Sequence, residues 1–401
     1  MKILISAGEA SSDAHGAELL RALQAQMPEG DSVEAFGVGG PKLQLAGLHA
    51  LVDAKDLLVM GFSEIIGRLP RILRALRTLE NAARSRRPDI AVVIDYPDFH
   101  FRLARKLKRV GIPVVYYIPP KVWVWRKGRM RLLRELFAQV LCILPFEEAL
   151  YRDAKVSVKY IGNPLVDELP MELSREEARR KLGIASEAKV LVLMPGSRPS
   201  ELKRHFEPML DAACIAARRM GQRLLVCVPL PSVVDPRETE TRLQIWMNHQ
   251  KDIPIDLKIS YGNAAEVLVA ADAGLIKSGT STLEAGLLRC PHVVVYRPSL
   301  LSEWIFKYLI RYKGPVGLVN LVSGWKPGQA YLTDEILMDH FKVPRLADEI
   351  VDLLTNEARR QRLAKGFNSL REAVMGEAGN GPSGPSARAA FEILRLVGIS
   401  K

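Results

Sequence analysis

The sequence feature that most constrains the fold is a repeated alternation of short apolar runs with helix-like segments. Residues 2–6 form a near-continuous apolar run, which is typical of a strand buried on both faces of a parallel sheet. A turn at residues 8–13 and a helical pattern over residues 14–24 follow directly. Further strands of the first half are predicted at residues 33–38, 90–94, 114–118 and 140–144. This order predicts a doubly wound α/β sheet, whose ligands bind at the carboxyl ends of the strands.

The alternation starts again near residue 190, which predicts a second domain of the same kind. A strand is predicted at residues 190–194, and the turn Pro195-Gly196-Ser197-Arg198 follows it. The remaining strands of this half are predicted at residues 224–228, 255–259, 274–276 and 292–295. Two Rossmann-like doubly wound domains that face each other across a cleft are therefore expected, an arrangement that suits an enzyme acting on a nucleotide sugar.

The domain boundaries follow from the irregular stretches between these patterns. The stretch around residues 163–173 predicts a linker, so the N-terminal domain is expected at residues 1–165 and the C-terminal domain at residues 166–375. Residues 376–385 are rich in glycine and proline and are expected to be flexible, and residues 386–397 form a last helix. The sequence leaves open whether this helix packs on its own first domain or on that of a partner in a homodimer.

Composition narrows the class of protein further. Hydrophobic content of 48% and charged content of 25% are ordinary for a soluble protein, and no run of about 18 apolar residues could cross a membrane. The N-terminus shows no signal-peptide layout, and the four cysteines are scattered without metal-ligand spacing. A cytoplasmic protein with reduced, mostly buried thiols is expected.

The net charge of +12 lies mainly in the first domain, where residues 1–165 hold 25 Lys and Arg against 17 Asp and Glu. A basic surface suits an anionic membrane or nucleic acid, or serves solubility alone. Because aromatic content is only 6% and no nucleic-acid-binding module is recognisable, no nucleic-acid partner is expected.

One basic amphipathic segment stands out at residues 70–83. Helical spacing places four apolar residues on one face, namely Ile72, Leu73, Leu76 and Leu79, and Arg71, Arg74 and Arg77 on the other. Such a helix can lie in a membrane interface with its arginines on phosphate headgroups, and Trp123 and Trp125 form a second candidate for that zone. It can equally be an ordinary surface helix packed on the sheet.

The stretch Ser278-Gly279-Thr280-Ser281-Thr282-Leu283-Glu284 follows an apolar run and precedes a helix predicted at residues 283–288. Unpaired N–H groups at a helix start suit an anion, so this turn is a candidate diphosphate site. Glu284 could accept hydrogen bonds from the ribose hydroxyls. The alternative is a Ser or Thr N-cap followed by an acidic first turn, which is common in helical proteins.

Two acids follow the strand predicted at residues 90–94. Asp95 and Asp98 flank Pro97 at the strand end, and an aspartate in a partly desolvated cleft can act as a general base. Asp95 is the preferred base because it is nearer the strand. Either acid could instead form an Asx turn or a helix cap.

Other candidates line the same predicted strand ends. The turn at residues 8–13 offers Glu9 as a catalytic candidate and Ser11 and Ser12 as substrate contacts, and His15 lies in the helix that follows. Arg198 could pair with a diphosphate, since a guanidinium matches phosphate geometry. Asn320, in an apolar run, is a further candidate contact, although it could belong to an ordinary turn.

Eight short motifs resemble those of the lipid-A-disaccharide synthase family and stand in the same order along nearly the whole chain. They are Gly8-Glu9-Ala10-Ser11-Ser12-Asp13, Gly37-Val38-Gly39-Gly40-Pro41, Met60-Gly61-Phe62-Ser63-Glu64, Ile94-Asp95-Tyr96-Pro97-Asp98-Phe99, Val122-Trp123-Val124-Trp125-Arg126, Leu144-Pro145-Phe146-Glu147, Pro195-Gly196-Ser197-Arg198 and Ser278-Gly279-Thr280-Ser281-Thr282-Leu283-Glu284.

The resemblance implies an inverting, UDP-dependent glycosyltransferase of GT-B fold, peripherally associated with the inner membrane of Gram-negative bacteria. It would join UDP-2,3-diacylglucosamine to 2,3-diacylglucosamine 1-phosphate in lipid A biosynthesis, without a metal or other cofactor. By the family pattern Asp95 is the base, Glu9 and Ser11 lie near the sugar and the acceptor, and UDP contacts the remaining candidates, which are Arg198, Thr280, Ser281, Glu284 and Asn320.

Four positions depart from the family pattern, and two alternatives remain beside it. The departures are Ser12, Asn163, Pro120-Lys121 and the segment 333–338 after Asn320. One alternative is a UDP-sugar 2-epimerase on the same fold, which a C2-inversion assay would separate from a transferase. The other is a non-catalytic peripheral membrane protein, which would bind vesicles without turnover.

Overall fold

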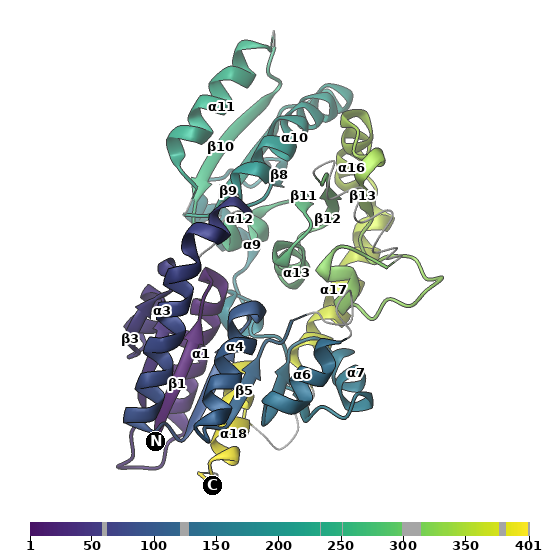
Figure 1. Cartoon of the computed structure of the whole chain (residues 1–401). Coiled ribbons are helices and arrows are strands. Elements are labelled where there is room, and N and C mark those ends of the chain that lie inside the picture. Colours follow the sequence, from purple (N-terminus) through teal and green to yellow (C-terminus); the bar gives the residue numbers. More distant parts are fainter. Residues whose placement is uncertain are drawn as a thin grey trace. The chain divides into compact units, whose positions relative to one another are not determined.

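The computed structural model of the protein (Figure 1) describes residues 1–57, 62–120, 128–232, 234–250, 252–298, 314–376 and 382–399, leaving aside the side chains of Ala10 and residues 62–69. The motif around Trp123 and Trp125, Met60-Gly61 and residues 377–381 of the glycine-rich segment lie outside these residues. The chain divides into two compact units. Unit 1 comprises Met1–Glu168 and Val374–Lys401, and unit 2 comprises Leu169–Ala373.

Unit 1 is built on a seven-stranded parallel sheet in the order β3-β2-β1-β4-β5-β6-β7. The strands are β1 (Lys2–Ala7), β2 (Glu34–Gly39), β3 (His49–Asp53), β4 (Ile90–Ile94), β5 (Val114–Tyr117), β6 (Gln139–Cys142) and β7 (Val158–Tyr160). Every residue of β4 is buried, as expected of a strand covered on both faces.

Helices cover both faces of this sheet. They are α1 (Ala10–Gln26), α2 (Pro41–Leu45), the 3-10 turn η1 (Ala54–Asp56), α3 (Phe62–Arg86), α4 (Pro97–Arg109), α6 (Arg129–Leu136), α7 (Glu147–Asp153), α8 (Leu165–Glu168) and α18 (Pro385–Leu396). Side chains of α3, α4 and α6 share one core cluster with the sheet, and those of α1 and α18 share the cluster on the other face.

Unit 2 repeats the plan with a six-stranded parallel sheet in the order β10-β9-β8-β11-β12-β13. Its strands are β8 (Val190–Met194), β9 (Leu224–Leu230), β10 (Ile255–Tyr261), β11 (Ala273–Lys277), β12 (His292–Tyr296) and β13 (Glu335–Leu337). Its helices are α9 (Arg175–Leu182), α10 (Pro199–Met220), α11 (Pro236–Asn248), α12 (Ala264–Ala270), α13 (Thr280–Leu287), α15 (Leu318–Val322), η3 (Met338–His340), α16 (Val343–Thr355) and α17 (Glu357–Met375).

The two parallel sheets with interleaved helices confirm the predicted fold class. The predicted strands at residues 90–94 and 190–194 coincide with β4 and β8. Sequence reasoning missed β3, β7 and β13, which together contain a single buried residue, Ile336. Helix α1 begins at Ala10 rather than at residue 14, so most of the predicted turn at residues 8–13 is helical.

The four apolar residues predicted to share one face of α3, between residues 72 and 79, mostly pack inside unit 1. Leu76 and Leu79 are buried in the cluster between α3 and the sheet, and Ile72 packs against it. Leu73 is 41% exposed. The sequence left two possibilities open for residues 70–83, a helix in a membrane interface and a surface helix packed on the sheet, and these contacts favour the packed helix. Among the described residues, no helix combines the length and the apolarity that a membrane crossing requires.

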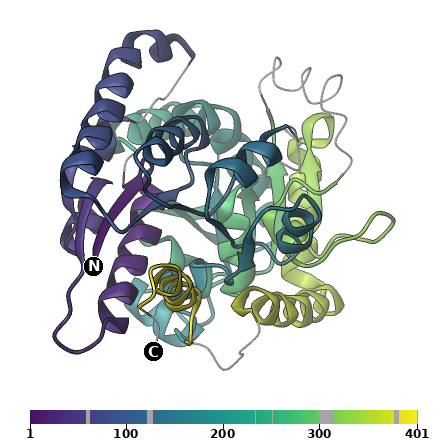
Figure 2. The same ribbon diagram turned by 60° about the horizontal axis from the view of Figure 1, so that its bottom comes forward.

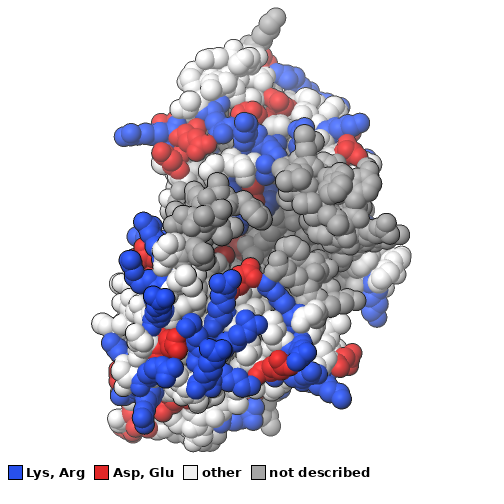
Figure 3. All heavy atoms as spheres, in the orientation of Figure 1, with Lys and Arg blue, Asp and Glu red and all other residues white. Residues whose placement is uncertain are grey.

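The outer surface of α3 and of its neighbours is basic, as Figure 3 shows for this face of unit 1. Helix α4 lies between α3 and α6. Among the side chains that the structure describes on the three helices, the exposed cations are Arg71, Arg74, Arg77, Arg84, Arg102, Arg105, Lys108, Arg109, Arg131 and Arg134. We call these ten residues the basic face.

The C-terminal helix α18 packs on α1 of the same unit (Figure 2). Ala389, Ala390 and Ile393 are buried in one cluster with apolar residues of α1. The Gln26 side chain also donates a hydrogen bond to the Ala387 carbonyl, 2.8 Å away. The last segment of the chain therefore completes the core of its first unit.

Candidate active site

The turn between β4 and α4 holds the preferred catalytic acid in an uncommon backbone conformation. Asp95 and Tyr96 have φ angles of +52° and +44°, in the left-handed region that residues with a Cβ usually avoid. Pro97 then starts α4 with a φ that suits the first helical turn. Two such residues in sequence persist only where their surroundings enforce them, which is common at functional sites. Asp95 itself is half-buried.

A buried polar network beneath the turn holds this conformation. The Asp95 carbonyl lies 2.6 Å from His100 Nδ1 and accepts a 2.9 Å hydrogen bond from the Tyr116 hydroxyl. His100 Nε2 lies 2.9 Å from Ser6 Oγ on β1. Burial lowers the pKa of His100 to about 4, so the ring is neutral at pH 7. Nδ1–H therefore donates to the carbonyl, and Nε2 accepts from the Ser6 hydroxyl.

Glu9 and Asp98 lie around Tyr96, beside Asp95. A Cβ on Gly8 would come within 2.8 Å of the Tyr96 ring, so the loop after β1 packs directly on the turn. Burial raises the pKa of Tyr96, and the negative charges of Glu9 and Asp98 raise it further. Asp98 is 78% exposed and forms an ion pair with Arg129. The parallel pairing of β1 with β4 thus brings all three predicted catalytic acids to one edge of the sheet.

The predicted substrate contacts on α1 are divided between the surface and the core. Ser11 is exposed, whereas Ser12 is fully buried. His15 is largely buried and pairs through Nδ1 with the Glu168 carboxylate. We therefore assign the side chains of Ser12 and His15 to the fold rather than to the substrate.

Sequence reasoning gave no role to Asp13, which organises the loop beside the site. Its buried carboxylate accepts hydrogen bonds from the backbone N–H groups of Gly40, Lys42 and Leu43, at 2.7–3.1 Å. These groups belong to the start of α2, so Asp13 supplies the capping oxygens that this helix needs. The signal available in the sequence was an aspartate opposite the Gly-Gly-Pro turn at residues 39–41.

In unit 2 the turn at Ser278–Glu284 is a helix start without a side-chain cap. Gly279 occupies the N-cap position of α13 and has no side chain that could accept from the first N–H groups. Ser278 Oγ donates instead to the Val316 carbonyl, and Thr282 Oγ1 donates to the Gly279 carbonyl. The Ser or Thr N-cap interpretation is therefore wrong. Thr280 is exposed and Ser281 is half-buried.

Helix α13 begins three residues earlier than predicted, at Thr280. Glu284 is consequently its fifth residue and half-buried, rather than part of an acidic first turn. Because the Glu284 carboxylate is one turn away from the helix start, an anion can approach the positive end of the helix without meeting this charge directly.

The turn after β8 lies beside this helix start. Strands β8 and β11 pair in parallel with Met194 opposite Ile276, so the segments that follow them meet at one edge of the sheet. Both line a small cavity of about 110 Å³, whose walls include Gly196, Ser197, Ser278, Thr280 and Ser281. Arg198 is exposed at the N-cap of α10, next to these residues. The structure thus brings together the predicted diphosphate contacts of unit 2.

Asn320 does not join them. It is fully buried, and its amide nitrogen donates 2.8 Å hydrogen bonds to the Thr333 carbonyl and to Glu335 Oε1. Its Oδ1 accepts from the Thr333 N–H. The Glu335 carboxylate also accepts from the N–H groups of Val316 and Gly317. Asn320 is therefore a structural anchor, and the segment 333–338, a departure from the family pattern, supplies its partners.

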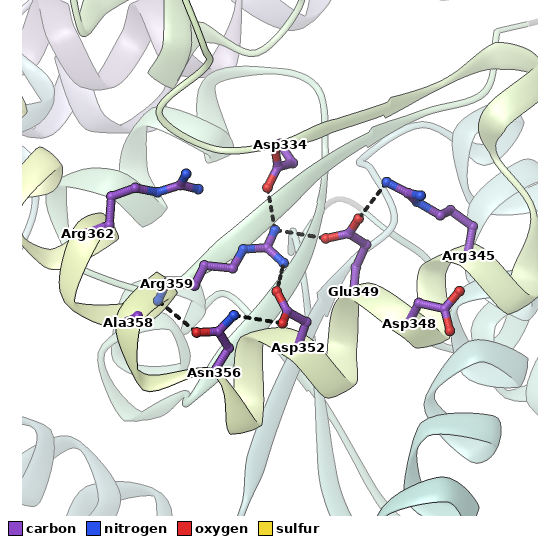
Figure 4. A pocket seen from close by; sticks show the side chains of 9 residues that line it. All are labelled: Asp334, Arg345, Asp348, Glu349, Asp352, Asn356, Ala358, Arg359 and Arg362. Atoms are coloured by element: carbon purple, nitrogen blue, oxygen red, sulfur yellow. Dashed lines mark hydrogen bonds and ion pairs between the residues drawn. The ribbon is translucent and has the colours of Figure 1, made fainter.

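A larger cavity of about 560 Å³ in unit 2 lies at α16 and α17, and Figure 4 shows its charged lining. Arg359 reaches into it and pairs with Asp334, Glu349 and Asp352 at 2.6–2.8 Å. These contacts tie α16 and α17 to the segment before β13. Since the charges mainly satisfy one another, we regard this cavity as a structural ion-pair cluster.

Comparison with known proteins decides the family. A family model described as lipid-A-disaccharide synthetase matches residues 3–377. The lipid-A-disaccharide synthase of Myxococcus xanthus (strain DK1622) is 39% identical over 397 residues, which cover 99% of this chain and 97% of that protein. The chain belongs to the lipid-A-disaccharide synthase family.

Solved structures resemble this synthase-family chain at the level of the fold. The UDP-GlcNAc 2-epimerase of Neisseria meningitidis, bound to UDP-GlcNAc, matches with a TM-score of 0.62 at 13% identity, covering 93% of this chain and 97% of the epimerase. A glycosyltransferase of Rickettsia africae ESF-5 matches with a TM-score of 0.57 at 11% identity, covering 99% and 98%. Such distant likenesses show the shared two-domain GT-B fold and do not favour the epimerase alternative.

Family membership confirms the resemblance drawn from the eight motifs and the activity that it implied. Lipid-A-disaccharide synthases are UDP-dependent glycosyltransferases of lipid A biosynthesis, so the chain is an enzyme of this class with a UDP-sugar and an acceptor as substrates. Within the residues that the structure describes, no group of three or more His, Cys, Asp or Glu side chains is arranged as a metal site. The four cysteines are all buried as free thiols.

Proposed function

We propose that this chain condenses UDP-2,3-diacylglucosamine with 2,3-diacylglucosamine 1-phosphate, forming the β-1,6-linked disaccharide 1-phosphate and releasing UDP. The observation that carries the proposal is the family match over residues 3–377, together with turns at the carboxyl ends of two parallel sheets. Ligands of open α/β sheets bind at this edge.

Asp95 acts as the general base in this proposal. It accepts the proton of the acceptor 6-hydroxyl as the oxygen attacks the anomeric carbon of the donor sugar, and the bond from that carbon to UDP breaks with inversion. The left-handed turn and the hydrogen bonds from His100 and Tyr116 fix the backbone that carries its carboxylate. Asp98 is the weaker candidate, because its side chain is 78% exposed and already paired with Arg129. Glu9 and Ser11 complete the acceptor side.

Unit 2 holds UDP and stabilises it as the leaving group. The first N–H groups of α13 and the hydroxyls of Thr280 and Ser281 meet the diphosphate, and Arg198 adds a guanidinium. Glu284, farther along α13, accepts from the ribose hydroxyls. Preorganised donors of this kind stabilise the charge that develops on the leaving phosphate.

We propose that the reaction needs no metal or other cofactor, which predicts full activity in the presence of EDTA.

The basic face is proposed to rest on the anionic surface of the inner membrane, from which both lipid substrates come. Its exposed arginines on α3, α4 and α6 provide charge for phosphate headgroups, each contributing on the order of 1 kcal/mol near such a surface. Because Ile72, Leu76 and Leu79 of α3 are used in the core, we propose that residues 70–86 of this helix contribute charge rather than an inserted apolar face.

The test of the function is an assay of purified protein with both lipid substrates, in which the disaccharide 1-phosphate and UDP are quantified by mass spectrometry. We expect one disaccharide per UDP released. Conversion of the UDP-sugar to its C2 epimer without any disaccharide would support the epimerase alternative. Vesicle binding without any turnover would support the non-catalytic one.

The role of Asp95 is tested by Asp95→Asn, which keeps the shape of the side chain and removes its basicity. We expect turnover to fall by about 10²-fold or more, because the proton acceptor is lost, while UDP binding measured by calorimetry stays within about twofold. Asp98→Asn is the matched control and should retain most of the activity. The reverse order of the two variants would move the base to Asp98.

A further inference from the structure

The cavity beside the α13 turn contains a cation that the proposed function has not used. Lys277 is the last residue of β11 and lies directly before the turn. Its ammonium is 2.7 Å from Glu201 Oε1 and 5.5 Å from the centre of the Tyr296 ring. The side chains of Lys277 and Glu201 are only 17% and 13% exposed, and both residues line the cavity.

Glu201 comes from the other turn that lines this cavity. It lies in the first turn of α10, and its Oε2 accepts a 3.1 Å hydrogen bond from the Ser197 N–H. Burial alone would raise the pKa of this carboxyl, but Lys277 and the Ser197 N–H outweigh it and the pKa is lowered. A Cβ on Gly196 would approach Oε2 to 2.5 Å, so the turn closes tightly on the carboxylate.

The position of this ion pair is difficult to explain by stability alone. A partly buried ion pair contributes little net stability, because the desolvation of both charges offsets their attraction. The ammonium of Lys277 is held in the wall of a cavity that is also lined by the two turns assigned to the diphosphate. An anion in that cavity would lie within reach of a cation that is already partly desolvated.

We propose that Lys277 is a diphosphate-binding residue, and that Glu201 holds its ammonium in place until the nucleotide binds. The inference rests on the proposed function, since it concerns the UDP subsite of that reaction. When UDP enters, the ammonium is shared between the Glu201 carboxylate and a phosphate oxygen. The chemistry recognised is that of a nucleoside diphosphate, and the nucleoside alone gains nothing from it.

A competing explanation is that Lys277 only neutralises Glu201, whose bare carboxylate would otherwise repel a diphosphate. The two explanations differ in what they predict for a double variant. If Lys277 binds the diphosphate, UDP binding is weak both in the variant that lacks Lys277 and in the double variant. If Lys277 only neutralises Glu201, UDP binding is weak in the single variant and returns to the wild-type level in the double variant.

The experiment measures the binding of UDP and of uridine by calorimetry in EDTA, for the wild type, Lys277→Met, Glu201→Gln and the double variant, with thermal unfolding as the check on folding. For Lys277→Met and for the double variant we expect UDP binding to weaken by about tenfold or more, the usual effect of losing a charge-assisted hydrogen bond. Uridine binding should change by less than about twofold. Glu201→Gln should bind UDP as tightly as the wild type or more tightly, because the amide oxygen can still accept from the ammonium while the negative charge that competes with the phosphate is gone.

Each contrary result is informative. Wild-type UDP affinity in Lys277→Met or in the double variant overturns the assignment of Lys277, as does an equal loss for UDP and uridine. Lys277→Arg keeps the charge and is the control for the case that Lys277→Met does not fold. It should retain UDP binding within about fivefold. A wild-type protein that binds no UDP would instead contradict the proposed function.

Discussion

At the scale of single residues, the turn after β4 shows how a buried network positions an exposed group. Asp95 and Tyr96 adopt left-handed backbone angles, and each residue of this kind costs about 1 kcal/mol or more. His100 and Tyr116 both donate to the Asp95 carbonyl and thereby hold that conformation. An acid at a strand end was recognisable in the sequence. Its supports were not, because the partner of His100 on β1, Ser6, is 94 residues away.

Buried histidines also set how the stability of this protein depends on pH. His292 is fully buried at the start of β12, stacks on Phe367, and has a pKa lowered from 6.5 to about 4 by burial. As the pH falls below 6.5, the unfolded state binds the proton and the folded state does not. Stability contributed by the neutral ring is therefore lost between pH 6.5 and pH 4, amounting to about 2 kcal/mol at pH 5.

The expected outcome is that His292→Phe flattens this dependence. Urea unfolding of unit 2 at pH 7 and pH 5 should show a loss of stability that is about 2 kcal/mol smaller for the variant than for the wild type. The matched control is His249→Phe, at an exposed position on the same unit. An unchanged difference between the two pH values in His292→Phe would show that this ring does not contribute to acid destabilisation.

At the scale of elements, α3 shows what an amphipathic pattern can and cannot predict. Helical spacing correctly separated apolar from basic residues, but it could not say whether the apolar residues meet the sheet or a membrane. The structure places Leu76 and Leu79 in the core and leaves Leu73 41% exposed. The difference arises because α3 packs against one side of its helical axis only, and Leu73 lies at the margin of that side.

The packing of α3 predicts that replacing Leu by Ala lowers the free energy of unfolding by different amounts at two positions of this helix. Leu76→Ala should lower the free energy of unfolding of unit 1 by about 2–4 kcal/mol, because it leaves a cavity in the core. Leu73→Ala on the same helix should cost about 1 kcal/mol or less. Chemical denaturation of the two variants provides the measurement. Equal losses of unfolding free energy in the two variants would contradict the exposed position of Leu73.

The arginines on the opposite side of α3 belong to the membrane proposal. Replacing Arg71, Arg74 and Arg77 by Gln should weaken binding to vesicles that contain anionic lipid by about 10²-fold, at roughly 1 kcal/mol for each charge. Raising the salt concentration should weaken wild-type binding in the same direction. Co-sedimentation with vesicles measures both effects.

The matched control for this prediction replaces three exposed cations of unit 2, Arg180, Lys181 and Arg237, by Gln. It removes the same net charge from the other unit, outside the basic face, and should bind vesicles nearly as the wild type does. If the affinity for vesicles is unchanged by salt and by both sets of substitutions, the basic face has no role in membrane binding.

At the scale of the whole molecule, the chain begins in unit 1, builds unit 2 and then returns. Helix α17 runs across the second boundary, and α18 packs on α1 with a gap of more than 350 residues between the contacting groups Gln26 and Ala387. Unit 1 therefore cannot complete its core until the last residues are available. Its stability depends on a helix that is distant in sequence.

The packing of α18 on α1 predicts which part of the protein is destabilised when a single side chain of α18 is removed. Ile393→Ala on α18 removes a fully buried group and should destabilise unit 1 by about 2–4 kcal/mol. Hydrogen exchange followed by mass spectrometry should show faster exchange in α1 and β1, with unit 2 unchanged. Leu396→Ala, 38% exposed on the same helix, is the control. Faster exchange confined to α18 would show that unit 1 is stable without it.

The sequence by itself determined the fold class, the central strands and the family, because apolar periodicity and short motifs are local properties of the chain. It also located Asp95 and the Ser278–Glu284 turn, since both directly follow a strand. Only the tertiary structure decided that Ser12, His15 and Asn320 are internal, that Gly279 leaves the start of α13 without a side-chain cap, and that Lys277 meets Glu201. These outcomes depend on hydrogen bonds and burial between segments far apart in sequence, which no local pattern encodes.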